Sequence, residues 1–124
     1  MKASTLSNFR LLPSAFCLGL ALVCAPVGAQ SYPAKPVRIV APFAPGGTAD
    51  TLGRIVAAKL TESLGQTFVV ENRAGAGGLV GSELVLKSAP DGYTLVVSGV
   101  ASHVIAPALA AKPPFDPLRD FTHI

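Results

Sequence analysis

The chain has 124 residues, of which 50% are hydrophobic and 14% charged, and this size suits one small globular domain. Its formal net charge is +3, but Lys2 and Arg10 lie in an N-terminal stretch without acidic residues. Without these two, eight of the ten basic residues remain against seven acidic ones. The charge therefore provides no electrostatic footprint for nucleic acid.

The N-terminus is typical of a secretory signal peptide. A polar stretch with Lys2 and Arg10 precedes an uncharged apolar run, 11–25, and a small-residue site at 27–29. The run is shorter than the ~20 residues that span a bilayer, which disfavours a membrane anchor. We expect export to the periplasm with cleavage after Ala29. The expected domains are a signal peptide, 1–29, and a mature part, 30–124, that does not span the membrane.

The first mature element is predicted to be a strand, 37–41, because it is rich in β-branched residues. A proline- and glycine-rich loop, 42–47, follows it. A helix is then predicted as far as Gly65, with Thr48 as its N-cap and Asp50 in its first turn, where a negative charge suits the helix dipole. Its apolar residues recur at helical spacing: Leu52, Ile55, Val56, Leu60 and Leu64.

The order of strand, glycine loop and helix then repeats. Strand 67–70 runs into the polar residues 71–73, glycine loop 74–78 and helical stretch 79–88. After the turn 90–92 come a third strand, 93–97, a third loop, 98–102, and a brief helix, 103–111, interrupted by Pro107. We expect 121–124 to begin a fourth strand.

This alternation predicts an α/β fold with a parallel sheet flanked by helices. Right-handed crossovers place all three loops at the carboxyl edge of such a sheet, where open α/β sheets bind ligands. The loops Gly46-Gly47-Thr48 and Gly75 to Gly78 each open a helix, whose free N–H groups favour an anion such as a carboxylate or phosphate. Tight turns without a ligand are the alternative.

Two nucleotide-binding patterns are weak or missing. No glycine is followed by Lys and then Ser or Thr, so a phosphate-binding P-loop is absent. Gly75, Gly77 and Gly81 form GxGxxxG, with Val80 in place of the third glycine of the dinucleotide fingerprint. A dinucleotide-binding oxidoreductase fragment therefore remains the alternative function.

Catalysis finds little support in the sequence. The mature part lacks cysteine, and it has neither histidine pairs at metal-ligand spacing nor a GxSxG motif. We expect no enzymatic activity, catalytic residue, metal or cofactor. Asp50 has a capping or a direct ligand role, Arg73 is a ligand partner or pairs with Glu71, and His103 is a capping or ligand-orienting donor beside Ser102.

Five motifs in order carry a resemblance to a known family. They are YPAKPVR (32–38), PFAPGGTAD (42–50), LGQ (64–66), VENRAGAGG (70–78) and APDGYTL (89–95). The chain resembles the tripartite tricarboxylate transporter substrate-binding proteins, the Bug family, over residues 32 to about 121. The resemblance implies a two-lobed periplasmic protein that closes over an organic acid, such as a di- or tricarboxylate, an aromatic acid or an acidic amino acid, and feeds a membrane permease or serves a sensor.

The resemblance also implies a ligand site at the strand-end loops, where backbone amides and hydroxyls hold the ligand carboxylate. Ala44, Ala74 and Ala106 depart from residues common in the family. Family members are roughly three times longer, so 30–124 would be the N-terminal part of lobe 1, truncated before the second lobe. Carried over, the site comprises Phe43, Gly47, Thr48 and Asp50, then Ala76, Gly77 and Gly78, then Ser98, Ser102 and His103.

Overall fold

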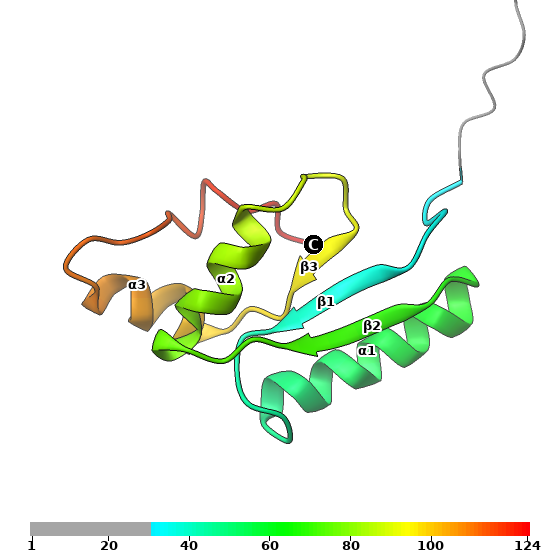
Figure 1. The fold of residues 1–124 in the computed structure, drawn as a ribbon, viewed down its shortest axis with the longest axis horizontal. Helices are drawn as coiled ribbons and strands as arrows, with labels where there is room; N and C mark the ends of the chain where they lie inside the picture. Colours follow the sequence, from blue (N-terminus) through cyan, green and yellow to red (C-terminus); the bar gives the residue numbers. More distant parts are fainter. Residues whose placement is uncertain (1–30) are drawn as a thin grey trace, which may run out of the picture. The chain divides into compact units, whose positions relative to one another are not determined.

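The computed structural model of the protein describes residues 31–124, which form a three-stranded parallel sheet with helices packed against it (Figure 1). Strands β1 (Val37–Ala41), β2 (Phe68–Asn72) and β3 (Thr94–Val96) pair in the spatial order β2-β1-β3. This confirms the expected α/β class. The predicted signal peptide and its cleavage site after Ala29 lie outside the described residues.

The helices follow the strands as the sequence predicts, with changed boundaries. They are α1 (Thr48–Leu64), the 3-10 turn η1 (Ala76–Gly78), α2 (Leu79–Leu86), the π-helical turn η2 (Ala101–Ile105) and α3 (Ala106–Leu109). Gly65 ends α1 in the left-handed conformation and donates its N–H to the Thr61 carbonyl, as expected of a C-terminal glycine. Pro107 does not interrupt a helix, since it lies in the first turn of α3, where proline is tolerated.

The expected N-cap of α1 was wrong by one residue. Thr48 is the first helical residue, and Gly47, in an extended conformation, is the N-cap. Gly47 has no side chain to accept hydrogen bonds from the first turn, and Thr48 is exposed. The first N–H groups of α1 are therefore not satisfied by a side-chain cap.

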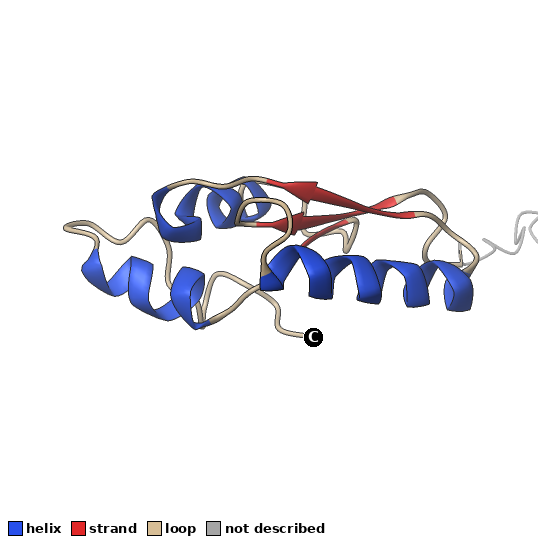
Figure 2. Ribbon diagram, turned by 90° about the horizontal axis from the view of Figure 1, so that it is seen from below, coloured by secondary structure: helices blue, strands red, loops and turns tan. Residues whose placement is uncertain are grey.

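Helix α1 lies on the sheet through small residues. Gly53 and Ala57 are buried, and a Cβ atom on Gly53 would lie 3.2 Å from Val97 Cγ2 and 3.6 Å from Val70 Cγ1. Ala57 belongs to a core cluster with residues of β1 and β2, and Leu60 packs against that cluster. Figure 2 shows α1 running along one face of the sheet.

The remaining apolar residues of the α1 period face outward. The exposed fractions of Leu52, Ile55 and Val56 are 52%, 57% and 49%, and Leu64 is also exposed. An amphipathic helix normally turns its large apolar residues to the core. Here the close approach at Gly53 and Ala57 leaves no room for them at the line of contact, so the amphipathic interpretation holds only for Leu60.

Helix α2 packs against the residues that directly follow β1 and β2. A Cβ atom on Gly81 would lie 2.9 Å from both the Arg73 carbonyl oxygen and Pro42 Cα, so only glycine fits there. Pro42 is fully buried, as is Val40, which points to the opposite side of β1 from the core residue Ile39. The contact fixes the second glycine loop, which leads into α2, beside the end of β1.

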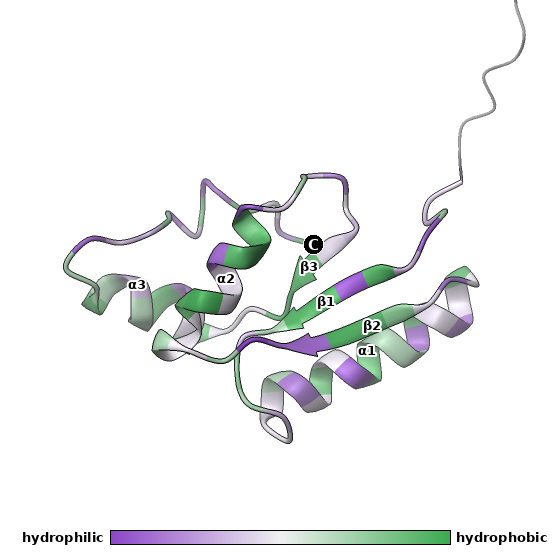
Figure 3. Ribbon diagram, in the orientation of Figure 1, coloured by the Kyte–Doolittle hydropathy of each residue, from purple (hydrophilic) through white to green (hydrophobic). Residues whose placement is uncertain are grey.

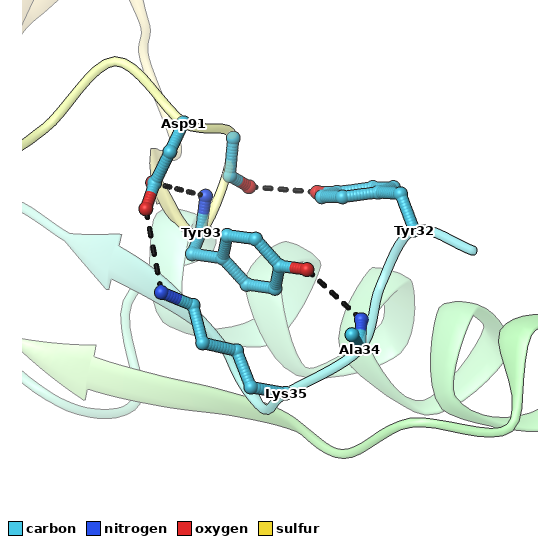
Figure 4. A network of polar contacts seen from close by, with 6 residues as sticks. Tyr32, Ala34, Lys35, Asp91 and Tyr93 are labelled. Atoms are coloured by element: carbon cyan, nitrogen blue, oxygen red, sulfur yellow. Dashed lines mark hydrogen bonds and ion pairs between the residues drawn. The ribbon is translucent and has the colours of Figure 1, made fainter. Parts of the chain in front are cut away.

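A polar network ties the start of the described chain to the turn before β3 (Figure 4). Tyr32 Oη donates to the Gly92 carbonyl at 2.7 Å, and the Ala34 N–H donates to Tyr93 Oη at 2.9 Å. Lys35 Nζ lies 3.4 Å from Asp91 Oδ2 and 4.3 Å from the centre of the Tyr93 ring. These contacts lie at the amino ends of β1 and β3, opposite the glycine loops.

The predicted fourth strand at 121–124 was wrong, because no strand follows Val96 within the described residues. Phe121 instead packs edge-on against His103, with ring centres 5.0 Å apart, and against Phe115 at 5.2 Å. Aromatic burial takes the place of strand pairing in this segment.

Candidate functional site

Three segments that follow the three strands meet around Gly78. A Cβ atom on Gly78 would lie 2.6 Å from Ser102 Cβ and 3.3 Å from Phe43 Cζ. Phe43 follows β1, Gly78 closes the loop after β2, and Ser102 lies in η2 after β3. The structure thus brings one residue from each predicted segment together at the carboxyl edge of the sheet.

The second glycine loop has an unusual backbone. Four successive residues, 75–78, have positive φ, and one of them is Ala76 with φ of 46°. A non-glycine residue in this region is strained by about 1 kcal/mol or more, and such strain is concentrated at functional sites. Ala76 and Gly77 are exposed while Gly78 is buried, so the loop presents its first part at the surface.

The first glycine loop is held from within by Asp50. Asp50 Oδ2 accepts a hydrogen bond of 2.9 Å from the Gly46 N–H, and Oδ1 lies 2.9 Å from an Arg54 guanidinium nitrogen. The second contact is an ion pair without hydrogen-bond alignment, so Oδ1 has no hydrogen-bond partner within the described residues. Asp50 is only 5% exposed. Asp50 therefore holds the loop that precedes α1, and it does not cap the first N–H groups of the helix.

The contacts of Asp50 keep it ionised. The Arg54 guanidinium, and after it the Gly46 N–H, lower the pKa of Asp50 from 3.8 to about 2, against the opposing effect of burial. The charge of this carboxylate is therefore balanced within the loop. A balanced charge matters because an unpaired carboxylate beside the free N–H groups of α1 would repel an anion.

Asn72, which no sequence motif marks as a site residue, connects the first loop to the end of β2. Its Nδ2 donates to the Phe43 carbonyl at 3.1 Å, and its Oδ1 accepts from Arg54 at 3.4 Å. The sequence of β2 places polar residues at this end of the strand. Figure 3 shows that β2 is apolar along most of its length and hydrophilic at its carboxyl end. A polar residue at the carboxyl end of a buried parallel strand is the signal that could have identified it.

The neighbouring charges of β2 form their own pairs. Glu71 lies 3.4 Å from Arg38 and accepts a hydrogen bond of 2.6 Å from Arg73 Nε. Of the two roles considered for Arg73, the structure shows the ion pair with Glu71.

The third segment is built around Ser102 and His103, both buried. Ser102 Oγ lies 3.1 Å from His103 Nδ1 and 3.3 Å from the Gly99 carbonyl, to which it donates. Burial, with a smaller effect from the charge of His123, lowers the pKa of His103 below its ordinary 6.5. The lowered pKa disfavours the charged imidazolium. In the tautomer with its proton on Nδ1, His103 donates to Ser102 Oγ, whose own proton is directed to the Gly99 carbonyl.

A hollow of about 350 Å³ lies beside this segment rather than over the glycine loops. Ser98 and His103 line it together with residues of α2, β3 and the C-terminal segment, including Asp120 and Phe121. The predicted residues thus fall into two groups. Phe43, Gly78 and Ser102 converge. Gly47 lies on the first loop, Thr48 and Asp50 lie in the first turn of α1, and Ala76 and Gly77 lie on the second loop, while Ser98 and His103 line the hollow.

Within residues 31–124, no three His, Cys, Asp or Glu side chains come together as a metal site would require. The helices of that same part are all too short or too polar to cross a bilayer.

A parallel sheet with glycine loops gathered at its carboxyl edge defines an α/β ligand-binding lobe. The family described as tripartite tricarboxylate transporter family receptor matches residues 52–124, more than half of the chain. The chain therefore belongs to this family. Protein BugT of Bordetella pertussis is 45% identical over an alignment of 104 residues that covers 82% of this chain and 32% of BugT. A protein from Agrobacterium vitis is 42% identical over 95 residues, 77% of this chain and 27% of that protein.

Solved structures agree with this assignment. MatC from Rhodopseudomonas palustris with bound malate superposes with a TM-score of 0.70 at 42% identity, covering 73% of this chain and 31% of MatC. An R. palustris protein with adipate superposes with a TM-score of 0.67 at 37% identity, and the match covers 70% of this chain and 29% of that protein. A periplasmic transporter superposes with a TM-score of 0.69 at 41% identity, and the match covers 72% of this chain and 30% of that protein. The chain spans about a third of the length of the curated relatives that it matches.

Proposed function

We propose that this protein is a periplasmic solute-binding receptor that captures the carboxylate group of a small organic acid on its strand-end loops. The convergence of Phe43, Gly78 and Ser102 at the carboxyl edge of the sheet carries the proposal, because it brings together the segments that follow all three strands, including the glycine loop that opens α2. Membership of a receptor family and the malate and adipate bound by similar proteins support it.

The proposed contact uses main-chain donors. The first N–H groups of α1, beginning with Thr48, have no side-chain cap, and the dipole of this 17-residue helix favours a negative charge there. Balanced by Arg54, Asp50 does not oppose the ligand. Ser102 would complete the site on the third segment, while Ser98 and His103 line the hollow beside it. A di- or tricarboxylate, an aromatic acid or an acidic amino acid would satisfy this chemistry, and no catalytic group is needed.

The test is a titration of the ¹⁵N-labelled chain with malate and adipate, followed by amide NMR. We expect the glycine-loop signals, Gly46, Gly47, Gly77 and Gly78, to shift with both acids and not with the uncharged malamide and adipamide. Amide shifts detect millimolar affinity, which suits a chain that spans a third of its relatives. A folded protein whose loop signals do not move with any carboxylate contradicts the proposal.

Thr48→Pro provides a matched variant, because it removes one proposed donor N–H at the first helical position, where proline is well tolerated. Gly47 already has the extended backbone, with φ of −78° and ψ of 173°, that a residue before proline adopts. Thr48→Ala removes the hydroxyl and keeps the N–H. Weaker binding in T48P alone assigns the contact to the main chain.

The predicted signal peptide and the periplasmic relatives support the proposed location, and the resemblance to the family supports the proposed organisation. Cleavage after Ala29 would release residues 30–124 into the periplasm as the front part of the first lobe of a two-lobed receptor, which hands its ligand to a membrane permease. Expression in a Gram-negative host, osmotic shock and intact mass measurement test the export. A product that begins at Met1 in the cytosolic fraction contradicts it.

A further inference from the structure

A closed ring of polar contacts surrounds the first glycine loop. The Phe43 carbonyl accepts from Asn72 Nδ2 at 3.1 Å, and Asn72 Oδ1 accepts from Arg54 at 3.4 Å. Arg54 pairs with Asp50 Oδ1 at 2.9 Å, and Asp50 Oδ2 accepts from the Gly46 N–H at 2.9 Å. The chain from Phe43 to Gly46 closes the ring.

We infer that Asn72 is a positioning residue that holds the first glycine loop in its ligand-receiving conformation. This inference rests on the proposed function, because the loop it holds is the proposed carboxylate site. Asn72 is the member of the ring that comes from another strand, so it ties the loop after β1 to the carboxyl end of β2. The other side chains of the ring, Asp50 and Arg54, belong to α1.

The amide group of Asn72 suits this position because it offers a donor and an acceptor on opposite sides. The donor faces a carbonyl and the acceptor faces a guanidinium, and the reverse orientation would place like dipoles together. A carboxylate would lose the bond to the Phe43 carbonyl, and an apolar side chain would lose both bonds. The ring also keeps Arg54 beside Asp50, which balances a carboxylate that would otherwise face the bound anion.

The experiment uses the full chain and compares Asn72→Leu with the wild type. Leucine has a similar size, carries no charge and so adds no repulsion toward an anion. Without ligand, we expect the Gly46 amide hydrogen to exchange roughly 3- to 10-fold faster in N72L and its proton signal to move, because the Asp50 contact loosens. With malate and adipate as probes, we expect dissociation constants to rise by a similar factor.

Glu71→Gln is the matched control. It lies beside Asn72 at the same strand end, and its ion pairs with Arg38 and Arg73 are outside the ring. E71Q should leave both the Gly46 exchange and the affinities unchanged. Arg54→Met is a second variant, which opens the ring at an exposed side chain if N72L fails to fold, and it should speed the Gly46 exchange in the same way.

The outcomes separate the inference from the function on which it rests. Faster exchange together with weaker binding in the ring variants, and neither in E71Q, supports the positioning role. Unchanged exchange, or faster exchange with unchanged affinity, overturns it. If the wild type binds no probe, the proposed function fails and the positioning role fails with it, while the ligand-free exchange still reports whether the ring holds the loop.

Discussion

The side chain of Ser102 occupies the space that a Cβ atom on Gly78 would need. The two atoms would lie 2.6 Å apart, a distance that real Cβ atoms essentially never show. Gly78 also has φ of 99°, a backbone conformation that is unfavourable for every residue other than glycine. The second and third segments of the candidate site are therefore joined through a contact that only glycine allows.

Replacing Gly78 by alanine is expected to destabilise the fold by at least about 2 kcal/mol, because left-handed strain and overlap with Ser102 act together. Urea unfolding followed by circular dichroism measures the change. Gly99→Ala is the control, since its φ is not in the left-handed region and no atom lies within 4 Å of the added methyl group. Equal stability losses in the two variants would refute the packing role of Gly78.

The low pKa of Asp50 predicts a specific acid sensitivity. Its pKa is about 2 in the folded protein and near 3.8 when unperturbed, so the stabilisation is fully present above pH 3.8 and is lost as the pH falls from there through about 2. Asp50→Asn should remove this part of the pH dependence. Unfolding free energies between pH 5 and 2.5 test it, with Asp91→Asn as a control for another carboxyl group of lowered pKa. An unchanged profile in D50N contradicts the assignment.

The large apolar residues of α1 that face solvent should tolerate polar substitutions, although their helical spacing in the sequence is typical of core residues. Ile55→Gln should change the unfolding free energy by less than about 0.5 kcal/mol, because Ile55 is exposed. Ala57→Leu should destabilise by about 1–3 kcal/mol, because the buried site has no room for the larger side chain. Chemical denaturation measures both. A larger loss for Ile55 than for Ala57 would show that α1 packs by its large residues.

Ser82, in α2, supports the second glycine loop through a hydrogen bond to its last residue. Its fully buried hydroxyl donates to the Gly78 carbonyl at 3.0 Å. Ser82→Ala should therefore cost about 1 kcal/mol of stability and speed amide exchange around Gly78. Ser63→Ala, at an exposed position of α1, is the matched control. If both substitutions have the same small effect, the hydroxyl does not hold the loop.

The three strands and their parallel pairing could be predicted from the sequence, because β-branched runs such as 37–41 are bounded by proline- and glycine-rich loops. The spatial order β2-β1-β3 was not predicted. The face of α1 could not, since the periodicity of Leu52, Ile55 and Val56 says nothing of how closely the helix approaches the sheet. That distance is set by Gly53 and Ala57 against Val70 and Val97. The expected strand at 121–124 failed for a similar reason, as Phe121 finds aromatic partners instead.

The glycine loops of the candidate site could be predicted from the sequence, but the residues that hold these loops in place could not. Gly47 and Gly78 could be identified from the sequence, because each lies a few residues after a predicted strand and directly before a predicted helix. Asn72 acts through a carbonyl 29 residues away, and Ser82 through a bond inside a buried turn. The partner of Asn72 is set by tertiary packing, which leaves no local pattern. The Ser82 hydroxyl bonds the carbonyl four residues earlier, which serine does in many helices, so its position alone does not identify it as a support of the loop.

The network of Tyr32, Ala34, Lys35, Asp91 and Tyr93 has a practical consequence for handling the protein. It anchors the start of the described part of the chain at the amino ends of the strands, at the far edge from the glycine loops. A fluorophore, surface linker or fusion partner attached just before Tyr32 would therefore emerge on the side away from the proposed capture site. An immobilised version built in this way would present its loops to the solution, as a biosensor requires.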